Sequence, residues 1–199
     1  MKKIIGNQIV LRDWKEKDIE EYYHWNSGKF LWLDFDGPYY PSISKTELEK
    51  RINFLKSQMR EKSFPEIRKR IVIVRPKSDR LIGILSRYWI NKETFWLAAG
   101  ISIYDDSYWN NGIGFEALGL WIQYLFDNFS EIVRLDLKTW SGNLGMMKLA
   151  EKLGFTLEAR FRKARIVDGI YYDSIGYGIL REEWNKFYPI GFKRFLNKK

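Results

Sequence analysis

Two glycines that separate an apolar run from an amphipathic segment are the clearest candidates for chemistry. The residues from Ala98 to Tyr104 suit a buried strand, and from Gly112 onward the apolar residues recur with helical spacing. The first N–H groups of a helix lack partners within it and the helix dipole makes that end positive, so a phosphate fits there. Gly112 and Gly114 have no Cβ, which lets a pyrophosphate approach the main chain. The spacing alone would equally suit glycines that ease a tight turn.

The sequence around these glycines resembles the acetyl-CoA pyrophosphate motif of the GNAT N-acetyltransferases. Residues 108–117 read Tyr-Trp-Asn-Asn-Gly-Ile-Gly-Phe-Glu-Ala, and they are most similar to the branch that contains the ribosomal-protein N-terminal acetyltransferases. Residues 143–155 resemble the next conserved block of that superfamily, in the expected order. The resemblance extends over residues 9–184, and it is more specific for fold and cofactor than for the acceptor.

The resemblance implies acetyl-CoA as the co-substrate, no metal, and a defined set of contacts. The central strand would pair with the pantetheine arm, the glycine loop would hold the pyrophosphate, and Asn143 would meet the arm from across the cleft. Asn143 is also a good helix N-cap, and that role alone is the alternative. The residues expected to bind the cofactor are Ile101, Ser102, Ile103, Trp109, Asn110, Asn111, Gly112, Ile113, Gly114, Phe115 and Asn143.

Acetyl transfer from a thioester to an amine needs a neutral amine, a donor for the carbonyl oxygen and a proton for the leaving thiolate. Compared with many members of the family, Ala98 stands where a Glu is common and Ala150 stands where a Tyr is common. The catalytic residues are therefore unassigned. The side chains that could act through a water are Asp36, Asp106, Ser141 and Tyr104. Alternatively, proximity and desolvation suffice, or the protein binds CoA without turnover.

Composition narrows the classes of function. With 199 residues, 45% of them hydrophobic, the chain is expected to form one domain over residues 1–199. It contains no Cys, which excludes disulfides and a thiol nucleophile, and a single His cannot form a His metal cluster. That residue, His24, is interpreted as packing or a cap rather than as a catalyst.

The net charge of +9 suits a polyanionic cofactor. A nucleic-acid binder is the weaker hypothesis, because no nucleic-acid motif accompanies the charge. No run approaches the ~20 apolar residues that span a bilayer, and the N-terminal segment lacks the long apolar run of a signal peptide. A cytoplasmic protein without membrane or nucleic-acid partners is expected.

The elements that must position these residues follow from periodicity. Strands are predicted at 8–12, 70–75, 81–90, the run ending at Tyr104, 132–139 and a hairpin over 160–178, with helices beginning near Asp13, Ser44, Gly112, Asn143 and Arg181. Because a helix connects the run ending at Tyr104 to 132–139, these two strands should run parallel. The fold class is α+β with three layers, a mixed, mostly antiparallel sheet of about six or seven strands flanked by helices. By resemblance it is GNAT-like, and the parallel pair splays apart at the cofactor site.

Two segments have open interpretations. The aromatic-rich loop 26–42 is either pinned to the core or forms a wall of the acceptor pocket, and the resemblance favours the wall. The basic residues between 160 and 165 form a solvated strand face, or they meet CoA phosphates or an acidic acceptor.

The sequence thus predicts an N-acetyltransferase that acts directly on a protein N-terminus or a small amine, without a covalent enzyme intermediate. The alternative is a non-catalytic CoA-binding module, and the resemblance also allows a homodimer.

Overall fold

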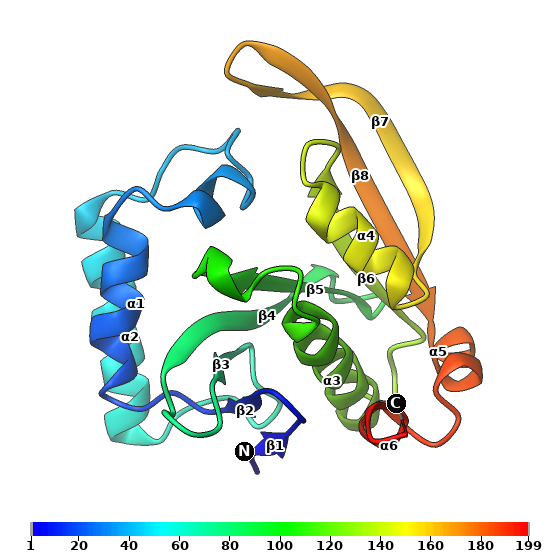
Figure 1. Ribbon diagram of the computed structural model, residues 1–199, viewed down its shortest axis with the longest axis horizontal. Helices are drawn as coiled ribbons and strands as arrows, with labels where there is room; N and C mark the ends of the chain where they lie inside the picture. The colour runs from blue at the N-terminus through cyan, green and yellow to red at the C-terminus, as the bar shows by residue number, and fades with distance from the viewer. Residues whose placement is uncertain (1, 199) are drawn as a thin grey trace.

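The computed structural model describes residues 2–198 as a three-layer assembly around one sheet (Figure 1). The strands are β1 (Ile4–Ile5), β2 (Val10–Arg12), β3 (Arg70–Val74), β4 (Leu81–Asn91), β5 (Trp96–Ile103), β6 (Arg134–Trp140), β7 (Thr156–Val167) and β8 (Ile170–Leu180). The helices are α1 (Asp18–Ser27), α2 (Lys45–Glu61), α3 (Ile113–Asn128), α4 (Leu144–Lys152), α5 (Arg181–Phe187) and α6 (Phe192–Leu196), with short 3-10 helices η1 (Leu31–Asp34) and η2 (Asp106–Tyr108).

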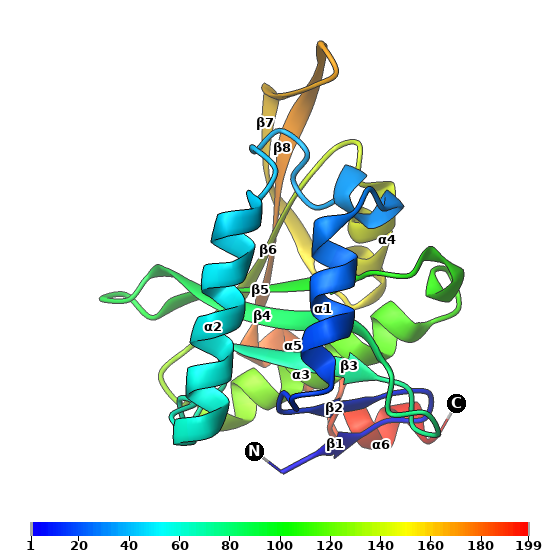
Figure 2. The ribbon, with the colours of Figure 1, turned by 90° about the vertical axis from the view of Figure 1, so that its left-hand side faces the viewer.

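The sheet is mixed, with the strand order β1-β2-β3-β4-β5-β6-β8-β7. The strands β3, β4 and β5 form the predicted antiparallel meander, and β5 pairs with β6 in parallel as the helical crossover requires. The α+β, GNAT-like fold class is confirmed. Figure 2 shows α1 and α2 side by side in front of the sheet, with α3 behind it.

Two apolar clusters hold the layers together. The larger one lies between the sheet and α3, where Trp121 and Leu118 are completely buried. The smaller one lies under α1 and α2, and includes Tyr22, Leu48 and Tyr104. Because successive side chains of a strand point to opposite faces, the sheet serves both clusters at once.

Three details differ from the sequence-based expectation. The sheet has eight strands rather than six or seven, because the two-residue strand β1 pairs with β2 and is too short to show a period. The helix α6 was not predicted, and it packs Phe192 against α3. Asp13 is not the N-cap of α1, because its carboxylate is bound by Arg68 at 2.8 and 3.0 Å and the helix begins only at Asp18.

The long β7–β8 hairpin confirms the turn predicted at Asp168 and Gly169, whose φ values are +49° and +77°. It extends past the other elements at the top of Figure 1. Its outer positions expose apolar side chains, among them Phe161 and Tyr171.

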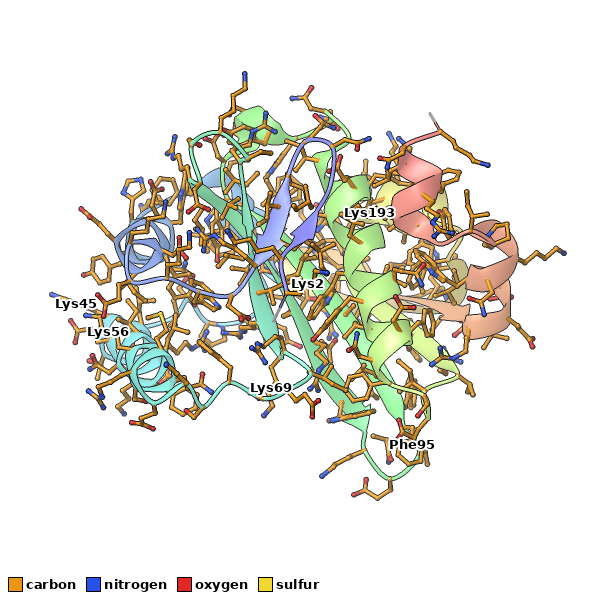
Figure 3. All side chains as sticks on the ribbon, turned by 90° about the horizontal axis from the view of Figure 1, so that it is seen from below. Lys2, Lys45, Lys56, Lys69, Phe95 and Lys193 are labelled. Atoms are coloured by element: carbon orange, nitrogen blue, oxygen red, sulfur yellow. The ribbon has the colours of Figure 1, made fainter. Side chains whose placement is uncertain are left out.

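The basic residues are dispersed on the side of the molecule drawn in Figure 3. The labelled lysines come from separate elements, namely the N-terminal segment, α2, the segment before β3 and α6.

Within residues 2–198, no helix combines the length and apolar character needed to cross a bilayer.

Candidate active site

The parallel strands β5 and β6 separate where the cofactor was expected. Their pairing begins at Leu97 and stops at Ala99, which lies opposite Leu137. Beyond this point β5 continues to Ile103 paired with β4, and β6 continues to Trp140 paired with β8. Within the described residues, the two strands therefore diverge and leave a gap between their carboxyl ends.

The direction of the peptide groups shows what faces this gap. The Tyr104 N–H donates to the Ile82 carbonyl of β4 at 2.9 Å, and Ser102 lies opposite Ile84. Because the hydrogen-bonding direction alternates along a strand, the peptide groups of Ile101 and Ile103 point away from β4, into the gap. The Ile103 carbonyl accepts from the Trp109 indole at 3.0 Å. Among the described residues, the peptide group of Ile101 and the N–H of Ile103 are thus left to pair with a ligand.

The glycine loop ends at the first turn of α3, next to the gap. Gly112 is the N-cap residue, its φ is +81°, and no side chain caps the helix. By contrast, Ser44 caps α2 and Asn143 caps α4. The amides that begin α3 therefore keep no side-chain acceptor and suit an anion.

Both glycines leave room beside the main chain. A Cβ on Gly112 would have Gln8 Nε2 as its nearest neighbour, at 3.6 Å, and Gly112 is exposed. A Cβ on Gly114 would lie 3.4 Å from Leu149 Cδ2 and 3.6 Å from Ile103 Cδ1, so α3, α4 and β5 converge there. Because neither glycine has a Cβ, a pyrophosphate can approach the main chain closely at both positions. The residues present fit the diphosphate of CoA.

The other predicted cofactor residues contribute main chain more than side chain. The side chains of Ile113 and Phe115 turn inward, the first buried and the second against Phe192 of α6. Asn110 is exposed with φ +59°, and Asn111 donates to the Ser107 carbonyl at 3.1 Å. The loop is therefore braced by the side chain of Asn111.

Sequence reasoning missed two residues that fix this loop, namely Gln8 in the connection between β1 and β2, and Glu116 in α3. The Gln8 side chain donates to the Asn111 carbonyl at 3.2 Å. The buried Glu116 carboxylate accepts from the Gln8 and Ile9 N–H groups at 2.9 and 3.3 Å. An acidic residue on the inner face of an apolar helix was the available signal for Glu116, whereas nothing in the sequence pointed to Gln8.

A third missed residue, Phe35, spans the gap, and we call it the strap. Its carbonyl accepts from Trp140 Nε1 at 3.2 Å and from Asn143 Nδ2 at 3.1 Å, both at the β6 side. Its ring meets Trp109, at the β5 side, with a centroid distance of 5.4 Å. Asn143 also accepts from the Met146 N–H at 2.9 Å, so its capping role is confirmed and its amide group serves two elements.

The aromatic loop 26–42 is pinned to the core, and its role as a wall of the acceptor pocket stays a prediction. Trp32 is buried against Tyr104 and pins the loop to the smaller apolar cluster. Tyr39 lies toward the opposite wall, with Trp140 at 6.3 Å and the Arg165 guanidinium over its ring at 4.6 Å. Arg160 pairs with Asp173 at 2.8 Å on an exposed part of the hairpin. His24 is exposed and packs against aromatic rings, as interpreted from the sequence.

The two positions at which many family members carry Glu or Tyr are buried in this protein. Ala98 is completely buried, and its register partner on β6 is the buried carboxylate of Asp136. Arg134 and Lys138 hold that carboxylate at 2.7 and 2.8 Å, so it is already neutralised. Ala150 is also completely buried.

The four candidate side chains differ in environment. Tyr104 is buried, and desolvation raises its pKa well above its ordinary value. The Ser141 hydroxyl accepts from the Asp173 N–H at 2.9 Å, and Asp106 is exposed in η2. Asp36 follows the strap directly. Desolvation raises its pKa, and Arg70 acts in the opposite direction.

Comparison with known proteins agrees with this geometry. The family model of the acetyltransferase (GNAT) domain matches residues 8–156, which is most of the chain. The chain belongs to the GNAT acetyltransferase family. It is therefore an acyltransferase whose co-substrate is acetyl-CoA. A search of curated proteins gives no match.

Solved structures share the fold at low sequence identity. A GNAT-family acetyltransferase from Bacillus anthracis is 19% identical with a TM-score of 0.70, covering 90% of this chain and 99% of its own. Spermidine N-acetyltransferase from Vibrio cholerae, in complex with CoA and spermine, is 18% identical with a TM-score of 0.70, covering 89% and 98%. RimL, the ribosomal L7/L12 alpha-N-protein acetyltransferase, in complex with CoA, is 21% identical with a TM-score of 0.65, covering 89% and 96%.

Proposed function

We propose that this protein transfers the acetyl group of acetyl-CoA directly to a primary amine in a ternary complex. The observation that carries the proposal is the gap beyond Ala99, which leads from the peptide group of Ile101 to the uncapped first turn of α3. That the eleven residues named from the sequence contact the cofactor stays a prediction, and the peptide group of one of them, Ser102, is directed to β4 rather than to the gap.

Direct transfer follows from the side chains at hand. The chain has no Cys to carry an acetyl group. The Ser141 hydroxyl is engaged by the Asp173 N–H, and the Tyr104 hydroxyl is buried. With no nucleophile exposed in the gap among these candidates, the amine itself attacks the thioester, and the site supplies position and a hydrogen-bond donor for the carbonyl oxygen.

The acceptor is a primary amine that reaches the gap between loop 26–42, which carries the strap, and the β7–β8 hairpin. Two neighbours support both acceptor classes, since one is named for spermidine and the other for a ribosomal protein N-terminus. We propose that residues 1–199 act as one transferase domain. A cytoplasmic location and a homodimer stay predictions.

Calorimetric titration with acetyl-CoA, followed by an assay of free CoA release with a panel of amines and N-terminal peptides, tests this function. We expect saturable binding and amine-dependent release. Absence of binding at high micromolar acetyl-CoA would contradict the cofactor site. Binding without release for every amine would favour a non-catalytic CoA-binding module instead.

A further inference from the structure

We propose that the carboxylate of Asp36 accepts the proton that the acceptor amine loses during acetyl transfer. The inference rests on the proposed function, and it assigns the acceptor-side group that Ala98 and Ala150 leave missing.

The first support is the position of the Asp36 backbone. Phe35, the preceding residue, is fixed across the gap by hydrogen bonds from Trp140 and Asn143. The Asp36 N–H itself donates to the carbonyl of Trp32 at 3.2 Å, and Trp32 is buried. Asp36 is thus held on a braced backbone at the opening of the gap. A group held in this way needs little reordering when the amine arrives.

The second support is that the Asp36 carboxylate is left without a partner. The buried carboxylates are all engaged: Asp18 by Arg12, Glu116 by backbone N–H groups, and Asp136 by Arg134 and Lys138. Among residues 2–198, no hydrogen bond or ion pair engages the Asp36 carboxylate, and the residue as a whole is exposed at the surface. A carboxylate with unused acceptor capacity can bind an N–H group of a substrate.

The third support is the charge around Asp36. Nearby protein desolvates the carboxyl group in part although the residue is exposed, and this raises its pKa above the ordinary value, the direction that favours a proton acceptor. Arg70, the first residue of β3, opposes this shift through its positive charge. Arg70 lies in the sheet row that continues through Ser86 to Gly100, just beyond the end of the β5–β6 pairing. The Arg70 backbone thus lies in the row of the sheet that passes beside the gap.

Each of the other three candidate side chains lacks either an open carboxylate or a braced position at the gap. Tyr104 is closed to solvent, and the Ser141 oxygen already accepts a hydrogen bond. Asp106 lies in η2, outside the strap that spans the gap. Asp36 alone among the four candidates combines an open carboxylate with a braced position at the gap.

The step balances without any further reactant. The lone pair of the neutral amine forms a bond to the thioester carbon, and the carbon–sulfur bond breaks with its electron pair on sulfur. The nitrogen loses one proton, which Asp36 receives and returns to solvent or to the thiolate. The products are the N-acetyl amine and CoA thiol.

The experiment compares Asp36→Asn with Asp34→Asn, which removes the same charge from an exposed position in the same loop. For an amine that the unaltered protein acetylates, we expect Asp36→Asn to lower kcat by roughly 10²–10³-fold, as loss of a general base does. Its acetyl-CoA affinity should stay within about twofold, which also shows that it folds. The acidic limb of the kcat/KM profile should disappear, and Asp36→Glu should retain part of the activity. Asp34→Asn should match the unaltered protein.

Each outcome has a distinct meaning. An Asp36→Asn variant that keeps kcat and the acidic limb overturns the role of Asp36 and leaves the proposed function intact. A reduced kcat with the acidic limb unchanged overturns proton transfer in favour of a structural role. Failure of the unaltered protein to release CoA with every amine overturns both proposals together.

Discussion

At the scale of single residues, the site depends on a glycine that lacks a Cβ and on an asparagine that uses both atoms of its amide group. Gly112 supplies a left-handed backbone and an open approach to the first amides of α3. Asn143 supplies an oxygen for the cap of α4 and an N–H for the strap. Both residues were predicted from the sequence, because a helix start depends on neighbours a few positions away.

Gly112→Ala should weaken acetyl-CoA binding and lower stability. A left-handed conformation costs a residue with a Cβ about 1 kcal/mol, and the added methyl narrows the approach to the amides. We expect the Kd for acetyl-CoA, measured by calorimetry, to rise roughly tenfold, or about 1.4 kcal/mol. Gly169→Ala in the hairpin turn, with φ +77° and no neighbour within 4 Å, is the matched control. It should lose similar stability and bind acetyl-CoA normally, so equal affinities of the two variants would refute the phosphate cradle.

Asn143→Ala should combine a stability loss with a binding loss. Removing an N-cap costs about 1 kcal/mol, and the strap carbonyl also loses a donor. Ser44→Ala removes the equivalent cap from α2, remote from the gap, and serves as the control. Denaturant unfolding should show similar losses for both variants, whereas only Asn143→Ala should raise the Kd for acetyl-CoA. Unchanged affinity would limit Asn143 to its capping role.

At the scale of elements, the site is formed where two strands diverge and a loop spans them. The strap is positioned by an indole from β6, an amide from α4 and a ring from the loop before α3. Each of these elements was predicted, but their meeting at Phe35 was not. Trp140 and Asn143 lie more than 100 positions from Phe35 in the chain and Trp109 lies 74 positions from it, and no local pattern links them.

Trp140→Phe should loosen the strap while keeping an aromatic ring. The Phe35 carbonyl would lose one of its two donors, a net effect of about 1 kcal/mol. We expect the KM for the amine to rise several-fold, with acetyl-CoA affinity nearly unchanged, in steady-state kinetics. The control is Trp121→Phe, which removes a comparable indole hydrogen bond, to the Ser86 carbonyl on the other side of the sheet. A control variant with the same rise in KM would argue against a specific role of the strap.

At the scale of the whole molecule, ionic contacts tie the N-terminal part to the sheet. The buried Arg12 of β2 binds Asp18 of α1 at 2.6 Å and Asp79, before β4, at 2.7 Å. Desolvation acts to raise the pKa of Asp79, but hydrogen bonds from Lys15, Arg12 and Lys17 outweigh it and hold that pKa well below its usual range. The layer that carries the strap loop is therefore joined to the sheet by charges.

Stability should fall in acid because of this network. A carboxylate whose pKa is lower in the folded state stabilises the fold fully above its unfolded pKa of about 3.9, and this contribution is lost as the pH falls through the folded value. We expect the thermal midpoint to drop below about pH 4 and the drop to be smaller in Asp79→Asn, which is less stable at pH 7. Scanning calorimetry of both proteins at pH 7 and below about pH 4 measures these thermal midpoints. Equal acid sensitivity of the two proteins would exclude Asp79 as a main cause.

The sequence by itself determined the main strands and helices, the caps at Ser44 and Asn143, and the glycine loop that opens α3. These features depend on spacing among nearby residues, and spacing is visible along the chain. Only the tertiary structure decided that β5 and β6 part after Ala99, that Phe35 spans them, and that Asp36 follows it at the gap. Those features depend on contacts between distant segments, whose geometry is fixed only when the layers pack.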